Sequence, residues 1–158
     1  MLGKITNIEE VTNFEVGNNF QLNGSIGARL GMTQMISSLS GSFTMDGYRI
    51  TTDKHTFLLL IDNGQSCCES WGYFSSEDDV NDFIGAELRE VNVVDKALNV
   101  KAFEENLPYG PDEGGAIFVN FETDRGTFQL TVYNAHNGYY GHEILLAKGE
   151  GIIERDTI

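Results

Sequence analysis

The sequence predicts an α+β fold, built mainly from antiparallel β-hairpins that form a curved sheet or partly open barrel with one short helix. Three observations support this class. The chain has 158 residues, enough for one domain with its own core. It has 18 glycines but only 2 prolines, a balance that suits tight turns. From residue 39 onward, Asn-Gly or Asp-Gly pairs, the strongest short-range hairpin signal, lie between β-prone runs.

These pairs predict three hairpins and the strands that flank them. The predicted turns and strands are Asp46-Gly47 between 39–45 and 48–52, Asn63-Gly64 between 56–62 and 65–73, and Asn137-Gly138 between 126–136 and 139–147. A fourth connection, residues 123–126, is expected to be a four-residue loop between 116–122 and 127–133.

The helix is expected over residues 76–84. Ser75 or Ser76 can cap it, and the acidic residues that follow suit the positive end of the helix dipole. Gly85 is expected to end it. An apolar stripe with i, i+3 and i+4 spacing should face the sheet; it consists of Val80, Phe83 and Ile84.

We expect one domain over residues 1–158, with a β-rich core at 39–148. Residues 1–38 show no sustained period and receive no assignment. Residues 87–95 are expected to form a strand. Residues 101–114, which contain both prolines, are expected to form a surface loop.

A two-residue turn at Asn63-Gly64 would assign the faces of the central hairpin. One face would carry Leu58, Leu60, Cys67 and Trp71, and the other Phe57, Leu59, Ile61 and Cys68. Both faces are apolar, which is typical of strands covered on both sides. This hairpin is therefore expected at the centre of the molecule.

The formal net charge is −14, and residues 77–114 carry 11 acidic against 3 basic side chains, a net of −8. This charge either keeps the surface solvated or engages a partner protein with a basic surface. Asp78, Asp79 and Asp82 are candidate partner-binding residues in this segment. Direct binding of nucleic acid is disfavoured, because phosphate neutralisation needs clustered Lys and Arg.

No secretory signal and no apolar run of membrane-spanning length is visible, so a cytoplasmic location is expected and no membrane partner. The only cysteines, Cys67 and Cys68, are then expected to be reduced. They are interpreted as buried and inert, although a nucleophile with a histidine base stays open as an alternative.

Residues 133–142 form the most unusual stretch. It offers seven candidate binding residues: Tyr133, Asn134, His136, Asn137, Tyr139, Tyr140 and His142. Trp71 is an eighth candidate from outside this stretch. In the predicted register His136 and His142 point to opposite sides, so no shared metal is expected, and no cofactor is assigned. The stretch is either a half-buried structural ribbon or a recognition surface.

The strings QSCCESWGY (65–73) and YNAHNGYYGH (133–142) resemble those of a small uncharacterised family associated with bacteriophages and with bacterial genomes that carry prophage. The resemblance covers residues 46–148. The family has no established activity, so no catalytic residue is carried over. The resemblance implies an accessory protein of a mobile element that acts inside a bacterial cell.

Three functions are consistent with these features. The first is a non-enzymatic interaction protein of the counter-defence type, which binds a host protein through the acidic surface or the aromatic ribbon. The second is a sponge or sensor for a nucleotide-like small molecule, stacked on the tyrosines or Trp71. The third is an enzyme that uses His136, His142 or a cysteine. The acidic balance disfavours a phosphorylated ligand, so the small-molecule function ranks second. The enzyme ranks third, because the sequence shows no spacing of residues typical of acid–base catalysis. A homo-oligomer stays open.

Overall fold

The computed structural model describes residues 1–15, 44–64, 70–107, 115–135, 141–149 and 151–158. The strands and helical segments of this described part are β1 (Gly3–Glu15), β2 (Thr44–Thr52), β3 (Thr56–Asp62), β4 (Ser70–Ser75), η1 (Val80–Phe83), β5 (Glu87–Val94), α3 (Val100–Asn106), β6 (Gly115–Thr123), β7 (Gly126–Ala135), β8 (Glu143–Lys148) and β9 (Gly151–Thr157). Segment η1 is a 3₁₀ helix and α3 is an α-helix. Neither of these described helices has the length and apolar character needed to cross a membrane.

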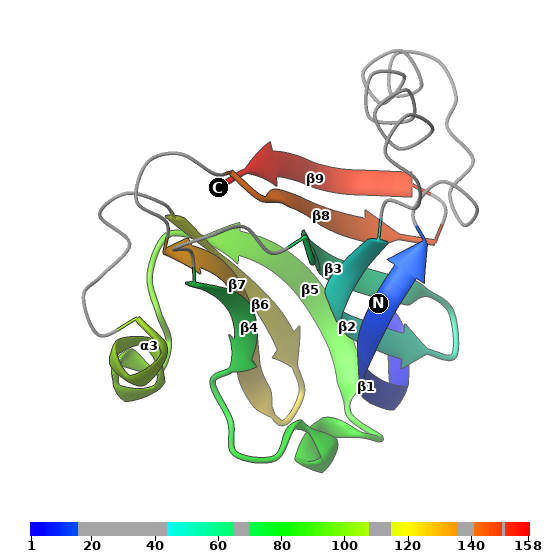
Figure 1. The fold of residues 1–158 in the computed structure, drawn as a ribbon. Helices are drawn as coiled ribbons and strands as arrows, with labels where there is room; N and C mark the ends of the chain where they lie inside the picture. The colour runs from blue at the N-terminus through cyan, green and yellow to red at the C-terminus, as the bar shows by residue number, and fades with distance from the viewer. Residues whose placement is uncertain (16–43, 65–69, 108–114, 136–140, 150) are drawn as a thin grey trace.

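All the described strands belong to one antiparallel sheet, in the order β4-β7-β6-β5-β1-β2-β3-β8-β9. Strand β1 joins the two halves. It pairs with β2 along most of its length but with β5 only at Gly3 and Lys4. The sheet is strongly curved and its edge strands, β4 and β9, do not pair with each other (Figure 1). The predicted fold class is therefore confirmed.

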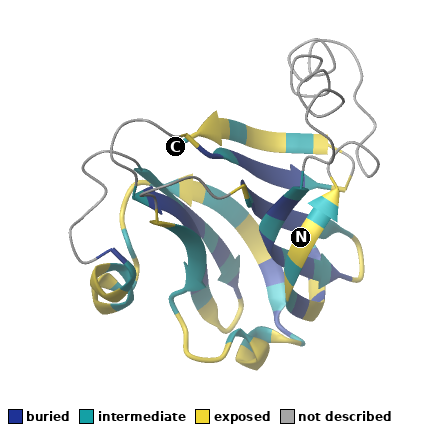
Figure 2. Cartoon of the chain, viewed as in Figure 1, coloured by how far each residue is buried: buried dark blue, intermediate teal, exposed yellow. Residues whose placement is uncertain are grey.

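The curvature packs the two halves of the sheet against each other. The ring of Phe57 in β3 lies 6.4 Å from that of Phe121 in β6, and the ring of Tyr48 in β2 lies 5.2 Å from that of Tyr73 in β4. Buried residues from both halves form one main apolar cluster. Figure 2 shows these buried residues along β3, β7 and β8, whereas β9 and α3 are largely exposed.

Strand β3 is buried on both faces, as predicted, because its sequence is continuously apolar. Phe57, Leu59 and Ile61 belong to the main cluster, whereas Leu58 and Leu60 belong to a second cluster on the other face. Its neighbours in the sheet are β2 and β8, so both of its hydrogen-bonding edges are occupied.

The predicted hairpin at Asn63-Gly64 is wrong. With both edges of β3 occupied, the strand that follows cannot pair with it, and β4 pairs with β7 instead. The side chain of Asn63 donates to Asp46 at 2.9 Å and ties β3 to β2 rather than turning the chain back. Trp71 packs on the main cluster, not with Leu58 and Leu60. Cys67 and Cys68 lie outside the described residues.

The predicted turn at Asp46-Gly47 is also wrong, because both residues lie inside β2. Gly47 pairs with Val11 on one side and Leu60 on the other. A Cβ at this position would collide with the carbonyl oxygen of Leu59, so the glycine permits a close approach of β2 and β3. On the edge away from β3, β2 pairs with β1, which comes from the segment that received no assignment.

The predicted hairpin at Asn137-Gly138 is wrong as well, although the pair itself lies outside the described residues. Strand β7 lies between β4 and β6, whereas β8 lies between β3 and β9, in the other half of the sheet. By contrast, the loop at 123–126 is confirmed. Thr123 pairs with Gly126, whose φ of 121° is one that glycine adopts readily.

The helix predicted over 76–84 is shorter than expected. Only Val80–Phe83 is helical, and its N-cap is Asp79, whose carboxylate accepts from the N–H of Asn81 at 2.9 Å. Gly85, with φ of 90°, follows as predicted. Of the expected apolar stripe, Val80 and Phe83 pack on the core but Ile84 is exposed.

Three described elements lie where no regular structure was predicted. Strand β1 comes from the unassigned N-terminal segment, and β9 follows the predicted core. Helix α3 replaces part of the loop expected at 101–114, and Asn99 caps it by accepting from the N–H of Ala102 at 3.1 Å. The strand expected at 87–95 is confirmed as β5.

Candidate functional site

A pocket of about 300 Å³ lies between the middle of β1, strand β2 and the segment that leads from β4 into η1. Among the described residues, its lining is dominated by acidic side chains and contains no lysine or arginine. The residues that define this acidic pocket are Glu9, Glu10, Tyr48, Glu77, Asp78 and Asp79.

The β1–β2 ladder builds one wall of the pocket. Glu10 of β1 is paired directly with Tyr48 of β2, and opposed residues of an antiparallel pair share a face of the sheet. The next pair is Glu9 with Arg49, whose side chains form an ion pair at 3.1 Å. Glu9 is therefore already compensated by a cation, and Glu10 is not.

The segment after β4 builds the other wall. Ser76 fixes it to β7, because its hydroxyl accepts from the N–H of Gln129 at 2.9 Å and its own N–H donates to the carbonyl of the same residue. The Ser75 hydroxyl accepts from the N–H of Glu77 at 3.1 Å. The two serines thus shape the segment rather than cap a helix, and Glu77 and Asp78 are left exposed at the pocket.

The three aspartates predicted in this segment have different positions. Asp78 and Asp79 line the pocket, and Asp79 also caps η1. Asp82 does not line it; its backbone carbonyl accepts from the Arg125 guanidinium at 3.3 Å.

Tyr48 is the least exposed of the six residues that define the pocket. Its residue surface is 5% exposed, and its ring packs edge-on against Tyr73. Its hydroxyl makes no hydrogen bond to any residue of the described part of the chain. Burial, with a further contribution from the negative charge of Glu10, raises the pKa of Tyr48 well above its ordinary value. The hydroxyl therefore stays protonated at neutral pH.

The carboxylates of the pocket are distributed over two separate segments, β1 and the stretch between β4 and η1. Within the described ranges, no group of three or more His, Cys, Asp or Glu side chains could hold a metal ion. A dispersed set of negative charges suits a larger cation with several hydrogen-bond donors.

The aromatic stretch predicted as a binding ribbon is largely internal where the structure describes it. Tyr133, Asn134 and His142 are all buried. The Asn134 amide donates to the carbonyl of Ile158 at 2.9 Å, and burial raises the pKa of Tyr133. The other predicted members, His136, Asn137, Tyr139 and Tyr140, lie outside the described residues.

Two predicted site residues do meet, but across the curved sheet. Trp71 of β4 stacks on His142, which precedes β8, with ring centroids 5.5 Å apart and planes inclined by 30°. His142 Nδ1 lies 2.6 Å from the carbonyl oxygen of Asp62, so Nδ1 carries the proton and donates it. This contact joins the two halves of the sheet and holds His142 in a buried, hydrogen-bonded position.

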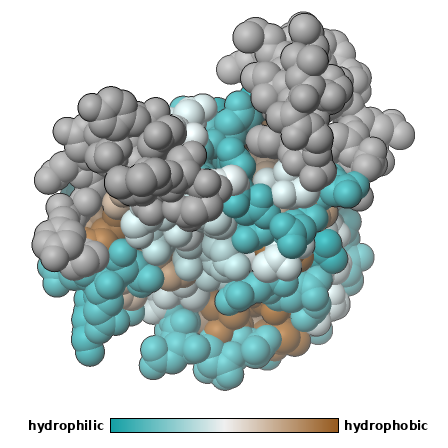
Figure 3. Space-filling model, viewed as in Figure 1, coloured by the Kyte–Doolittle hydropathy of each residue, from teal (hydrophilic) through white to brown (hydrophobic). Residues whose placement is uncertain are grey.

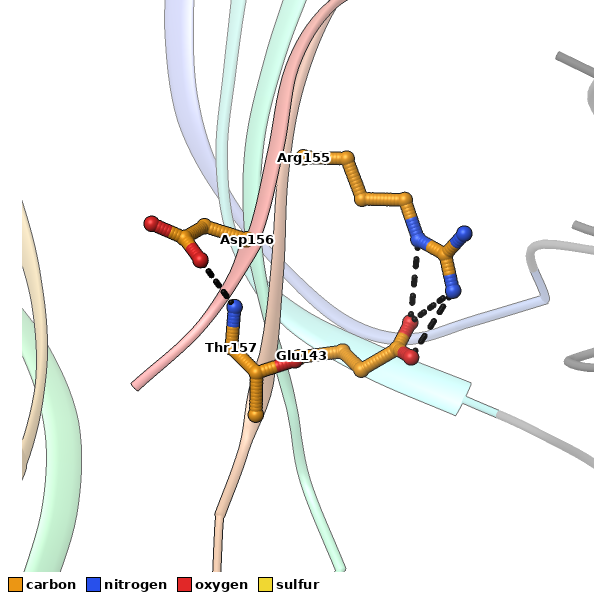
Figure 4. A network of polar contacts seen from close by, with 4 residues as sticks. All are labelled: Glu143, Arg155, Asp156 and Thr157. Atoms are coloured by element: carbon orange, nitrogen blue, oxygen red, sulfur yellow. Dashed lines mark hydrogen bonds and ion pairs between the residues drawn. The ribbon is translucent and has the colours of Figure 1, made fainter. Parts of the chain in front are cut away.

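Glu143, an acidic side chain outside the pocket, forms an ion pair with an arginine, unlike most of the pocket carboxylates. Arg155 of β9 grips the carboxylate of Glu143 in β8, with Nη2 at 2.8 and 2.9 Å from its two oxygens (Figure 4). The neighbouring Asp156 accepts from the N–H of Thr157 at 2.8 Å. Hydrophilic side chains dominate much of the ungreyed surface in Figure 3, with smaller apolar areas between them.

Sequence reasoning missed Glu9, Glu10 and Tyr48. The adjacent acids Glu9 and Glu10 lie between Ile8 and Val11, which was a weak signal for a strand with a charged face. Nothing in the sequence showed that this strand lies beside β2 and near the segment after β4.

Comparison with known proteins gives a family but no activity. No curated protein and no solved structure matches the chain. The sequence profile of one family, described as a domain of unknown function, matches residues 1–146. This chain therefore belongs to the DUF7448 family of domains of unknown function.

Proposed function

We propose that this chain is a non-enzymatic interaction protein that binds a basic segment of another protein at the acidic pocket. One observation carries the proposal: several carboxylates surround a pocket to whose lining the described part of the chain contributes no basic side chain. Within the described part of the chain, only Glu9 among them has an ion-pair partner. Glu10, Glu77, Asp78 and Asp79 therefore leave four formal negative charges for a ligand to neutralise.

The electrostatics favour a basic partner over a nucleotide-like ligand. A phosphate placed in this pocket would be repelled by the same four carboxylates, whereas lysine and arginine side chains would be attracted. Of the aromatic residues considered for stacking, the two that the structure describes are already engaged, because Tyr133 is buried and Trp71 stacks on His142. Of the two histidines considered as catalytic residues, the structure describes His142. Its ring is hydrogen-bonded to the carbonyl of Asp62 and stacked on Trp71.

The cellular setting is part of the proposal. The strings at 65–73 and 133–142 resemble those of proteins associated with phages and prophages. We infer that the chain is an accessory factor of a mobile element, that it acts in the bacterial cytoplasm, and that its partner is a host protein with a basic surface.

The test uses a defined basic peptide, Lys-Lys-Gly-Lys-Gly-Lys-Lys, and measures its affinity by calorimetry at several salt concentrations. The pocket variant is Glu77→Gln/Asp78→Asn, because both side chains are exposed and Asp79 is needed as a cap. The matched control is Glu104→Gln/Glu154→Gln, which removes the same charge from exposed positions on α3 and β9.

We expect the pocket variant to weaken peptide binding about fivefold, and the control less than twofold, since each exposed ion pair contributes roughly 0.2–1 kcal/mol. Added salt should weaken binding to the native protein and shrink this difference. Equal weakening by both variants would show that only the overall charge matters. Absence of peptide binding would also contradict the proposal.

A further inference from the structure

Tyr48 is a buried residue whose hydroxyl has no hydrogen-bond partner among the described residues and whose side chain lines the acidic pocket. The residue is 95% buried, since its exposed fraction is 5%, and it lines the same wall of the pocket as its cross-strand partner Glu10. No described residue forms a hydrogen bond with its hydroxyl. The hydroxyl oxygen is not among the buried polar atoms that lack a partner, so solvent reaches it although the rest of the side chain is buried. The pocket is the side from which a hydrogen-bond partner can come.

We propose that the acidic pocket binds the guanidinium group of an arginine side chain of the partner, with the Tyr48 hydroxyl and the Glu10 and Asp78 carboxylates as hydrogen-bond acceptors. This inference rests on the proposed function and specifies its ligand. It assigns to Tyr48 the role of distinguishing arginine from lysine.

The distribution of acceptors favours a guanidinium over a metal ion or an ammonium group. No described set of three carboxylates converges on one point, as a metal would require. A guanidinium presents five N–H donors spread in a plane, whereas an ammonium group is a compact point charge with three. The proposed acceptors lie on two walls of the pocket. Tyr48 and Glu10 belong to the β1–β2 wall and Asp78 to the segment after β4, and this spread matches the wider guanidinium group.

The size of the pocket fits a single side chain. Its volume of about 300 Å³ lies at the lower end of the range for small-molecule sites, roughly 300–1,000 Å³. The charge also fits, because a protonated Tyr48 adds no further negative charge and keeps oxygen lone pairs to accept from an N–H.

The test compares peptides of the form Lys-Lys-Gly-X-Gly-Lys-Lys, in which X is arginine, lysine or the uncharged isostere citrulline. The flanking lysines keep the general attraction constant, so X reports on the pocket. Each peptide is titrated into the native protein, the Tyr48→Phe variant and the pocket variant Glu77→Gln/Asp78→Asn. Tyr133→Phe is the control, because it removes a hydroxyl from another buried tyrosine that does not line the pocket.

We expect the native protein and Tyr133→Phe to bind the arginine peptide about tenfold more tightly than the lysine or citrulline peptide, as one hydrogen bond to a charged group allows. Tyr48→Phe should abolish most of this preference, so that the variant binds the arginine and lysine peptides with similar affinity. Thermal unfolding of each variant confirms that the fold persists.

Two other outcomes are distinguishable. If all three peptides bind equally and Glu77→Gln/Asp78→Asn still weakens them, the guanidinium assignment is overturned and the basic-partner proposal stands. If Glu77→Gln/Asp78→Asn changes nothing, both proposals fail.

Discussion

The two ends of strand β4 contact the rest of the sheet in opposite ways. Near its first end, the half-buried Trp71 stacks on the buried His142, and His142 donates to the carbonyl of Asp62, so these polar and aromatic groups have partners within the protein. At its last end, Ser75 lines the acidic pocket, where the described lining residues include exposed carboxylates but no lysine or arginine. Strand β4 is at one edge of the curved sheet, whereas β8, which follows His142, and β2, which lines the pocket, lie beyond β1 in the strand order (Figure 1).

The difference indicates which region stabilises the fold and which is available to a ligand. Satisfied, buried groups contribute to folding and have little capacity left for binding. Uncompensated charges contribute little to stability, and here they repel one another slightly, yet they favour a cationic ligand strongly. Substitutions at the two ends of β4 should therefore separate stability from binding.

The largest effect is expected at the Trp71–His142 contact. His142→Ala removes a buried ring, its stacking on Trp71 and its hydrogen bond to Asp62. We expect a loss of about 3 kcal/mol in the free energy of unfolding, measured by urea denaturation. Glu77→Ala, at the exposed end, should change it by less than about 0.5 kcal/mol. Similar losses for both variants would contradict the division between the two regions.

High pH should destabilise the protein through the buried tyrosine of the pocket. The pKa of Tyr48 is raised in the folded chain, so the unfolded chain loses this proton first as pH rises. The stability that Tyr48 provides is complete below about pH 10 and falls above it. At about pH 11 the loss reaches about 1.4 kcal/mol for this residue.

Denaturation of native protein and Tyr48→Phe at neutral and alkaline pH measures this loss. The variant should match the native stability at neutral pH and exceed it at high pH. A native protein whose stability falls no more steeply than that of Tyr48→Phe would show that this hydroxyl is not held protonated.

A smaller effect separates two adjacent aspartates of the pocket. Asp79 caps η1 by accepting from the N–H of Asn81, whereas Asp78 makes no hydrogen bond to a described residue. Asp79→Ala should lower stability by about 1 kcal/mol, and Asp78→Ala should leave it unchanged. Thermal denaturation of the two variants checks this, and an equal effect would contradict the assigned cap.

The sequence predicted those parts of the fold that depend on local signals. The continuous apolar run 57–61 correctly indicated a strand buried on both faces, and 123–126 correctly indicated a hairpin loop. The three Asn-Gly or Asp-Gly dipeptides misled because each was taken as a turn between two strands that are adjacent in sequence and would pair with each other. Gly47 is required by the close approach of Leu59, and Asn63 forms a cross-strand hydrogen bond, neither of which local sequence reveals.

The candidate site was predictable only in part for the same reason. Asp78 and Asp79 were identified from charge density, which is a local property. Glu10 and Tyr48 come from strands whose pairing depends on long-range packing, so their position beside the aspartates could not be read from the sequence. The aromatic stretch stayed open between a half-buried structural ribbon and a recognition surface, because composition does not reveal burial. Tyr133 and His142 are inside.

The central claim is that the acidic pocket, and not the acidic surface as a whole, receives a basic segment. The most direct measurement is the change in backbone amide chemical shifts on titration with Lys-Lys-Gly-Arg-Gly-Lys-Lys. We predict that the largest changes fall on Glu9, Glu10, Tyr48 and residues 77–81, which surround the pocket. Changes of equal size at the exposed acids of α3 and β9, or none at the pocket, would contradict the account.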